Sequence, residues 1–129
     1  MYESIARIVA VGVGGGIGSA LRYVLGGVVQ RASDAFPIGT MAVNVTGCLA
    51  IGFLAERFGE TTVDPLVRTG VLIGVLGGYT TFSSFSLDSL KLAADRQFLA
   101  ALINVMGTVA ACLTATWAGQ RLAKWMAAG

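Results

Sequence analysis

Charged side chains are confined to a few short segments of this chain, and no other feature constrains its fold as strongly. Three stretches contain no charged side chain: residues 35–55, 69–87 and 97–120. A fourth stretch, residues 8–30, contains only Arg22. A helix needs about 20 mostly apolar residues to cross the hydrocarbon core of a membrane. The sequence therefore predicts an all-α membrane protein, with residues 1–129 forming a single domain of four transmembrane helices.

The composition agrees, because 55% of the residues are hydrophobic and 12% are charged, whereas about 25% are charged in a typical soluble domain. We expect the helices at about these ranges: 5–29, 38–57, 67–94 and 97–124. The first is expected to be retained rather than cleaved as a signal peptide, because it lacks a basic leading segment and contains Arg22.

The third predicted helix is interrupted by polar residues. Residues 77–86 read Gly-Gly-Tyr-Thr-Thr-Phe-Ser-Ser-Phe-Ser. Lipid offers no partners to backbone N–H and C=O groups, so a break at membrane depth is tolerated only where it faces protein, an ion or water. We predict a break at residues 77–81, and this favours a function in ion handling.

Two polar side chains in the first two helices each allow two interpretations. Arg22 is costly at the bilayer centre. It either reaches carbonyls near the helix end or raises the local potential for anions. Asn44 either bonds one helix to another or offers its N–H donors to an anion that has lost its water.

Aromatic and polar residues of the last two helices are the other candidates. Phe82 and Phe85 share a helical face, and such pairs either pack in a core or turn their electron-poor ring edges toward an anion. In the fourth helix a polar residue recurs every four positions: Asn104, Thr108, Cys112 and Thr116. These groups either bond back to their own backbone or form a hydrogen-bonding track.

Several absences narrow the function. The chain has no histidine, the commonest general base and metal ligand, so no enzyme activity is expected. Both cysteines, Cys48 and Cys112, lie inside predicted spans, where buried packing is the simplest interpretation. No carboxylate lies at mid-membrane, and Asp88 is the nearest. A small dual-topology exporter of cationic drugs, the main alternative, would need such a group.

Glycines spaced four apart, such as Gly14 and Gly18, indicate close helix packing and not a nucleotide-binding loop, since G-x-G-x-x-G fits no register. A non-transporting assembly subunit would explain this packing, but not the polar groups aligned on two helices. No nucleic-acid partner is expected.

Loop charges give a weak orientation signal under the positive-inside rule. Five basic residues fall on one side: Arg7, Arg57, Arg68, Arg121 and Lys124. Three fall on the other: Arg31, Lys91 and Arg96. The difference either fixes one orientation or permits both, and insertion both ways would allow an antiparallel homodimer. Such a dimer would supply the inverted symmetry from which transport paths are commonly built.

Three motifs resemble one known family across essentially the whole chain. Residues 77–86 resemble the G-G-x-T-T-F-S-T-F signature of the bacterial CrcB/Fluc fluoride channels. Residues 18–23, Gly-Ser-Ala-Leu-Arg-Tyr, resemble that family's first-helix arginine motif. Residues 39–47 resemble its G-T-x-x-x-N-x-x-G segment. The resemblance implies an antiparallel, dual-topology homodimer in the bacterial inner membrane that exports fluoride passively and lowers its toxicity.

The same resemblance implies roles for individual residues. The fluoride pathway would comprise an amide donor, two aromatic rings and a polar track: Asn44, Phe82, Phe85, Thr108, Cys112 and Thr116. Backbone carbonyls of Gly77 and Thr80 from both subunits would hold a structural Na⁺ that is not transported. Three positions depart from the family pattern: Ser84 replaces a common Thr, Cys112 stands where Ser is common, and Asn104 occupies an expected aromatic or His position.

Overall fold

The computed structural model describes residues 2–128, which contain helices and turns and no strand. The first two spans are α1 (Tyr2–Gln30) and α2 (Ile38–Glu60), and the last is α6 (Phe98–Ala128). The third consists of α3 (Pro65–Thr69), the π-helix η1 (Gly70–Val75), α4 (Leu76–Tyr79) and α5 (Phe82–Ala94). Within residues 2–128, four helical segments are long and apolar enough to cross a membrane. The prediction of an all-α, multi-pass membrane protein is confirmed.

The third span begins and ends its helices at sites that the sequence explains. Asp64 caps α3 by accepting a hydrogen bond from the Leu66 N–H, 2.6 Å away, and Pro65 occupies the first turn, where no N–H partner is needed. Thr81 caps α5 by accepting from the Ser84 N–H at 3.1 Å. In η1, the Leu76 N–H donates to the Val71 carbonyl, the wider bonding of a π-helix.

The predicted interruption at residues 77–81 is narrower in the structure. Gly77 and Gly78 lie inside α4, and only Thr80 and Thr81 have extended backbone, with ψ of 158° and 114°. The reason is that the two glycines keep ordinary negative φ angles. Gly78 serves packing instead, because a Cβ there would collide with the Gly15 carbonyl.

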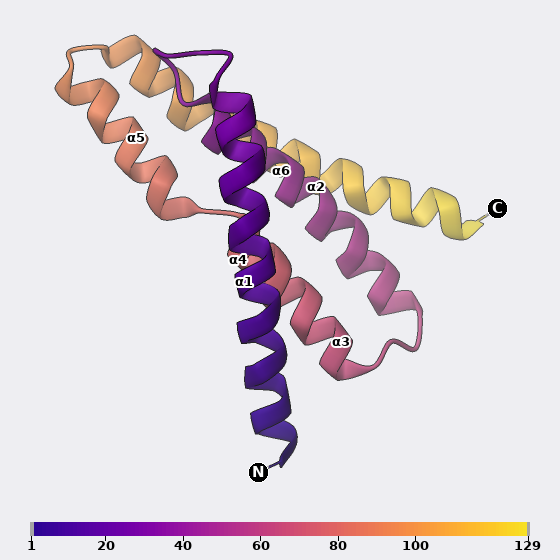
Figure 1. Cartoon of the computed structure of the whole chain (residues 1–129). Helices are drawn as coiled ribbons and strands as arrows, with labels where there is room; N and C mark the ends of the chain where they lie inside the picture. Colours follow the sequence, from indigo (N-terminus) through magenta and orange to yellow (C-terminus); the bar gives the residue numbers. More distant parts are fainter. Residues whose placement is uncertain (1, 129) are drawn as a thin grey trace.

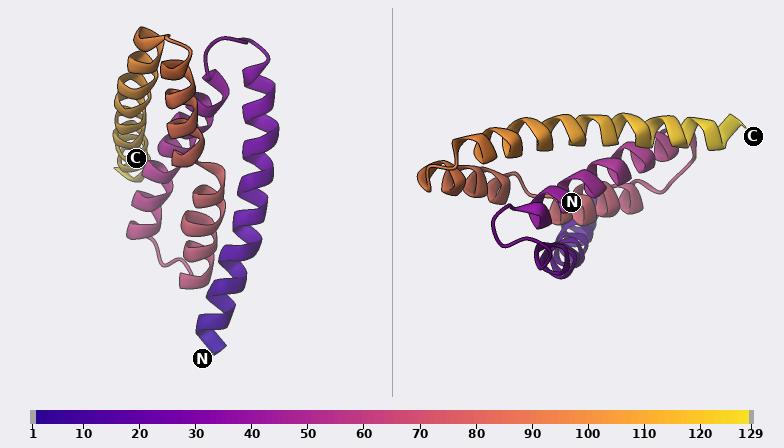
Figure 2. Two further views of the ribbon diagram at one scale, coloured as in Figure 1. Left: turned by 90° about the vertical axis from the view of Figure 1, so that its left-hand side faces the viewer. Right: turned by 90° about the horizontal axis from the view of Figure 1, so that it is seen from above.

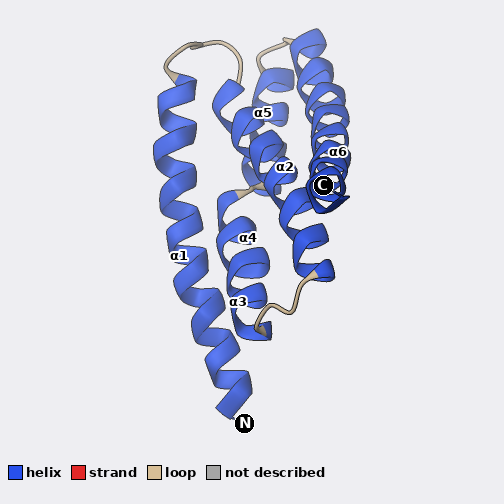
Figure 3. Ribbon diagram, turned by 90° about the vertical axis from the view of Figure 1, so that its right-hand side faces the viewer, coloured by secondary structure: helices blue, strands red, loops and turns tan. Residues whose placement is uncertain are grey.

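The spans pack side by side, with α1 and α6 on opposite sides of the molecule (Figures 1 and 2). The most extensive contact is between α2 and α6. Helix α1 packs mainly on η1 and α4, and α5 lies against α6 (Figure 3). The extended link between α4 and α5 thereby lies next to α2, in the interior of the bundle.

Glycines bring these helices close together, as small residues do in membranes. Gly14 and Gly18 of α1 face η1 and α4, where an added Cβ would meet the carbonyls of Gly70 and Val75. Between α2 and α6, a Cβ on Gly52 would collide with the Thr116 carbonyl. The backbones therefore touch where a side chain would hold them apart.

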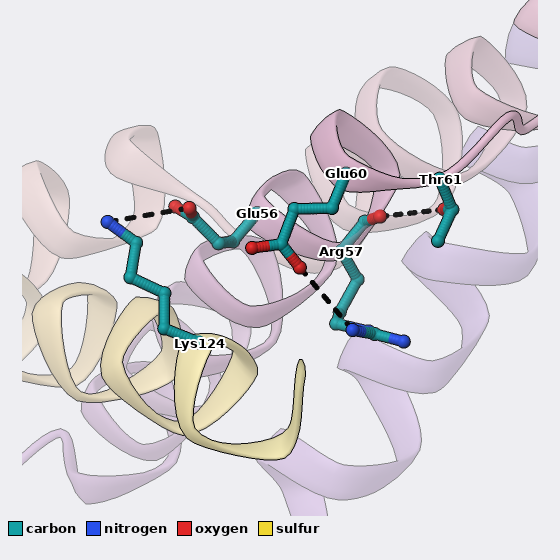
Figure 4. A network of polar contacts seen from close by, with 5 residues as sticks. All are labelled: Glu56, Arg57, Glu60, Thr61 and Lys124. Atoms are coloured by element: carbon teal, nitrogen blue, oxygen red, sulfur yellow. Dashed lines mark hydrogen bonds and ion pairs between the residues drawn. The ribbon is translucent and has the colours of Figure 1, made fainter. Parts of the chain in front are cut away.

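Charged groups gather where α2 ends beside the last turns of α6 (Figure 4). Lys124 of α6 lies 3.5 Å from Glu56 of α2, and Arg57 lies 3.4 Å from Glu60. The Thr61 hydroxyl donates to the Arg57 carbonyl at 2.7 Å and ends the helix. Exposed ion pairs contribute at most about 1 kcal/mol each, so their main effect is to mark this polar end of the bundle.

Candidate functional site

An open groove of about 360 Å³ lies between α2, the third span and α6. Seven of the nine predicted site residues line it: Asn44, Gly77, Thr80, Phe82, Phe85, Thr108 and Cys112. Apolar side chains form most of the remaining wall: Ile51, Leu72, Leu76, Val109 and Leu113. None of the described residues lining the groove is charged. The groove therefore combines hydroxyl, amide, thiol and aromatic groups in an apolar setting.

Asn44 joins α2 to the extended link. Its Nδ2 donates to the Thr81 carbonyl at 3.0 Å, and its Oδ1 accepts from the Thr81 N–H at 2.7 Å. Both residues are buried, with exposed fractions of 8% and 7%. The structure therefore supports the interpretation that the Asn44 side chain bonds one helix of the bundle to another. A carboxamide has two N–H donors, and among the described residues only Thr81 accepts from this one.

Two carbonyls at the link lose the partners that a continuous helix would provide. The Gly77 carbonyl would accept from the N–H of Thr81, but that N–H donates to Asn44. The Thr80 carbonyl would accept from the N–H of Ser84, but that N–H donates to the Thr81 hydroxyl. Since helices bond residue i to residue i−4, both carbonyls are left available at the groove.

Phe82 and Phe85 form an aromatic pair at the start of α5. Their ring centroids are 5.4 Å apart and their planes are inclined by 50°. Phe85 is buried, whereas 77% of Phe82 is exposed in the single chain. Such an inclined pair presents a ring edge as well as a face.

A chain of hydrogen bonds connects α5 with the polar residues of α6. The Thr108 hydroxyl donates to Asn104 Oδ1 at 3.4 Å, Asn104 Nδ2 donates to Ser89 Oγ at 2.9 Å, and Ser89 Oγ donates to the Phe85 carbonyl at 2.8 Å. Asn104 and Thr108 are nearly inaccessible. The Thr108 hydroxyl is thereby oriented by a buried network, which ends at the backbone of Phe85.

Two predicted residues lie away from the groove. Thr116 bonds back to the Cys112 carbonyl at 3.0 Å and packs against Gly52. A step of four residues advances about 40° beyond a full turn of an α-helix, so Thr116 has rotated away from the face that carries Thr108. Arg22 lines a separate hollow of about 280 Å³, together with Thr81 and Ser84. It belongs to α1, across the molecule from α6.

Sequence reasoning missed the central role of Thr81. Its backbone N–H and carbonyl both form hydrogen bonds with the Asn44 side chain. Its hydroxyl contacts Ser83 Oγ and Ser84 Oγ, both at 3.1 Å. A Thr placed three residues before a Ser at the start of a helix is a capping pattern, so a local signal was present. The role of Ser89 has no comparable local signal, because its partner Asn104 lies on another helix.

Residues 9–120 match the family model described as CrcB-like protein, Camphor Resistance (CrcB). The chain belongs to the CrcB family. This confirms the resemblance predicted from the three motifs.

Curated relatives within the CrcB family match nearly the whole chain. A protein of Geobacter sulfurreducens named "Fluoride-specific ion channel FluC" is 47% identical over 117 residues, 89% of this chain and 94% of the relative. A protein of Rhizobium meliloti with the same name is 46% identical over 122 residues, 93% of this chain and 98% of the relative. These relatives are named as channels, and the expectation that the chain is not an enzyme is confirmed.

Proposed function

We propose that this chain forms a fluoride-selective channel through which fluoride leaves the bacterial cytoplasm passively, across the inner membrane. The observation that carries this proposal is the 47% and 46% identity, over nearly the full length, to relatives named as fluoride-specific ion channels. The groove supports it independently, because it offers hydrogen-bond donors and no charged side chain among its described lining residues.

The chemistry of the groove suits a small, strongly hydrated anion. Fluoride must exchange its water for other donors, and hydroxyl, amide and ring-edge groups provide positive hydrogens without a fixed charge. Asn44, Thr108, Phe82 and Phe85 line the same groove between α2, the third span and α6. We assign these residues, with Cys112, to the fluoride pathway. Thr116 and Arg22 would act outside the groove.

The cation-exporter alternative is not favoured. An exporter coupled to protons needs a membrane carboxylate that binds and releases them. Asp88 accepts a hydrogen bond from Thr40 at 2.7 Å and lines a different hollow, together with Lys91. The family match points the same way.

We further propose that two chains associate in opposite orientations. Phe82 is 77% exposed in the single chain, and none of the described residues would approach a Cβ on Gly77 within 4 Å. A second chain lying over this surface would cover both residues and complete the groove. Opposite orientations would produce the inverted symmetry that transport paths commonly use.

We propose that a structural Na⁺ binds at the carbonyls of the link. Gly77 and Thr80 have carbonyls whose helical partners are diverted to Asn44 and Thr81. Carbonyls of broken helices and the C-terminal ends of half-helices are the usual ligands of Na⁺ inside membranes. The ion would supply positive charge that joins the two α4 ends, while Asn44 and Thr81 hold the carbonyls in place.

Ion efflux from liposomes tests the proposed function. Purified protein is reconstituted into vesicles loaded with potassium fluoride or potassium chloride, with sodium gluconate on both sides of the membrane, and valinomycin carries the balancing K⁺. We expect rapid fluoride efflux and negligible chloride efflux. Equal rates for both anions, or no fluoride efflux from vesicles shown to contain folded protein, would overturn the proposal. The second result would also favour a non-transporting assembly subunit.

A further inference from the structure

The two cysteines of the chain lie next to each other on facing helices. Helices α2 and α6 run in the same direction (Figure 1), and Gly52 of α2 packs directly on Thr116 of α6. Cys48 and Cys112 are one turn earlier on each helix, at the same register. Both line the same groove.

The thiols are also accessible, because both side chains are only partly buried. Neither belongs to a larger group of ligands, since no cluster of three or more His, Cys, Asp and Glu side chains occurs within residues 2–128. A zinc ion normally takes four protein ligands in a structural site. Two thiols without further donors instead suit a soft metal ion that accepts two sulfur ligands in a line.

The surroundings select the charge of that ion. None of the described lining residues of the groove carries a charge, so a charged complex would be stabilised by no counter-ion and would lose its water. A divalent ion that displaces both thiol protons leaves a neutral bis-thiolate: Hg²⁺ + 2 RSH gives Hg(SR)₂ + 2 H⁺. A monovalent ion bound to two thiolates would leave a net negative charge.

We propose that Cys48 and Cys112 together form a binding site for a soft divalent metal ion, of which Hg²⁺ is the probe, and that its occupation blocks the groove. The metal binds between α2 and α6, in the groove that Phe82 and Phe85 also line, and one turn from Thr108. The blocking part of this proposal rests on the proposed fluoride channel. The binding part does not.

The binding part is tested by stoichiometry. Purified protein is mixed with HgCl₂, passed through a desalting column containing a dilute monothiol competitor, and measured by intact mass and by maleimide labelling. We expect one Hg²⁺ per chain, with both thiols protected. Cys48→Ala and Cys112→Ser should each lose the metal to the competitor, because a single thiolate has no advantage over it. Two ions per chain, or retention by either variant, would overturn a shared site.

The blocking part is tested in liposomes, with each protein compared with its own untreated flux. Hg²⁺ should abolish fluoride efflux by the unmodified protein, and dithiothreitol should restore it. Zn²⁺ should leave the efflux unchanged. Cys48→Ala should be insensitive, and inhibition that persists in it would overturn the assignment. If the untreated protein conducts no fluoride, the channel proposal fails, while the stoichiometry still decides the metal site.

Discussion

The Asn44 side chain forms hydrogen bonds with both the backbone N–H and the backbone carbonyl of Thr81, so neither group takes part in helical hydrogen bonding. The link between α4 and α5 stays extended because the replacement bonds come from a neighbouring helix. The same arrangement frees the Gly77 carbonyl. One side chain therefore connects the packing of α2 with the chemistry of the groove.

Replacing Asn44 by leucine should destabilise the protein and stop fluoride efflux. The change leaves the buried N–H and carbonyl of Thr81 without partners, and each such group costs about 1–3 kcal/mol. The melting temperature in detergent and the liposome flux measure the two effects. Thr114→Val, at an exposed position of α6, is the control and should change neither. A variant Asn44→Leu with unchanged stability would show that the link is held by other contacts.

The two phenylalanines should separate stability from conduction. Phe85 is buried and Phe82 is largely exposed within the chain. Phe85→Ile should therefore lower the melting temperature, at a cost of about 1 kcal/mol for a reshaped core side chain, whereas Phe82→Ile should not. Both variants should slow fluoride efflux, because both lose a ring edge. If Phe82→Ile conducts normally while remaining dimeric, its ring has no role in the path.

At the level of helices, glycines let α1 lie directly against the third span. Gly18→Ala would push a Cβ into the Val75 carbonyl of η1 and the Tyr79 nitrogen of α4, where neither backbone can give way easily, so α1 should separate from the third span. We expect loss of folded protein on size-exclusion chromatography. Gly16→Ala is the matched control, since none of the described residues lies within 4 Å of its added Cβ. Equal yields of monodisperse protein from both variants would contradict the packing.

The link between α4 and α5 should respond to the removal of Na⁺. If the carbonyls of Gly77 and Thr80 hold this ion, its binding stabilises the folded dimer by mass action. Replacing Na⁺ by N-methyl-D-glucamine should lower the melting temperature and stop fluoride efflux, and restoring Na⁺ should reverse both. K⁺ serves as the control for ionic strength. A melting temperature independent of Na⁺ would rule out a stabilising site.

The helices were largely predictable from sequence, whereas their mutual register was not. Hydropathy adds up along the chain, so the four spans follow from local composition. Shared helical faces also brought Phe82 near Phe85, and Thr108 near Cys112. The Asn44–Thr81 bonds depend on how α2 is set against the third span, which no local pattern encodes. The π-helix η1 is likewise not encoded by a local pattern, because it forms where α1 packs closely against the third span.

At the scale of the whole molecule, the single chain does not enclose a path for an ion. Its groove is open on one side, and the exposed Phe82 is part of the groove lining. The basic residues differ by only two between the two sides of the membrane, five against three. A weak bias of this kind leaves both orientations accessible. In an antiparallel pair, the groove surface of each chain would cover the groove of the other chain.

The orientation can be measured with single cysteines at two exposed loop positions, Ala32 and Thr62. Cys48→Ala and Cys112→Ser remove the native thiols, and Ala32→Cys or Thr62→Cys is then added. These loops lie on opposite sides of the membrane in any one orientation, because α2 crosses between them. With both orientations present, a membrane-impermeant maleimide applied to intact cells should label about half of the molecules at each position. Complete labelling at one position and none at the other would show a single orientation.

Adding two arginines beside Thr62 should then shift the population toward one orientation, because the charge difference between the two sides becomes larger. Fluoride efflux should fall, since chains in the opposite orientation would become scarce.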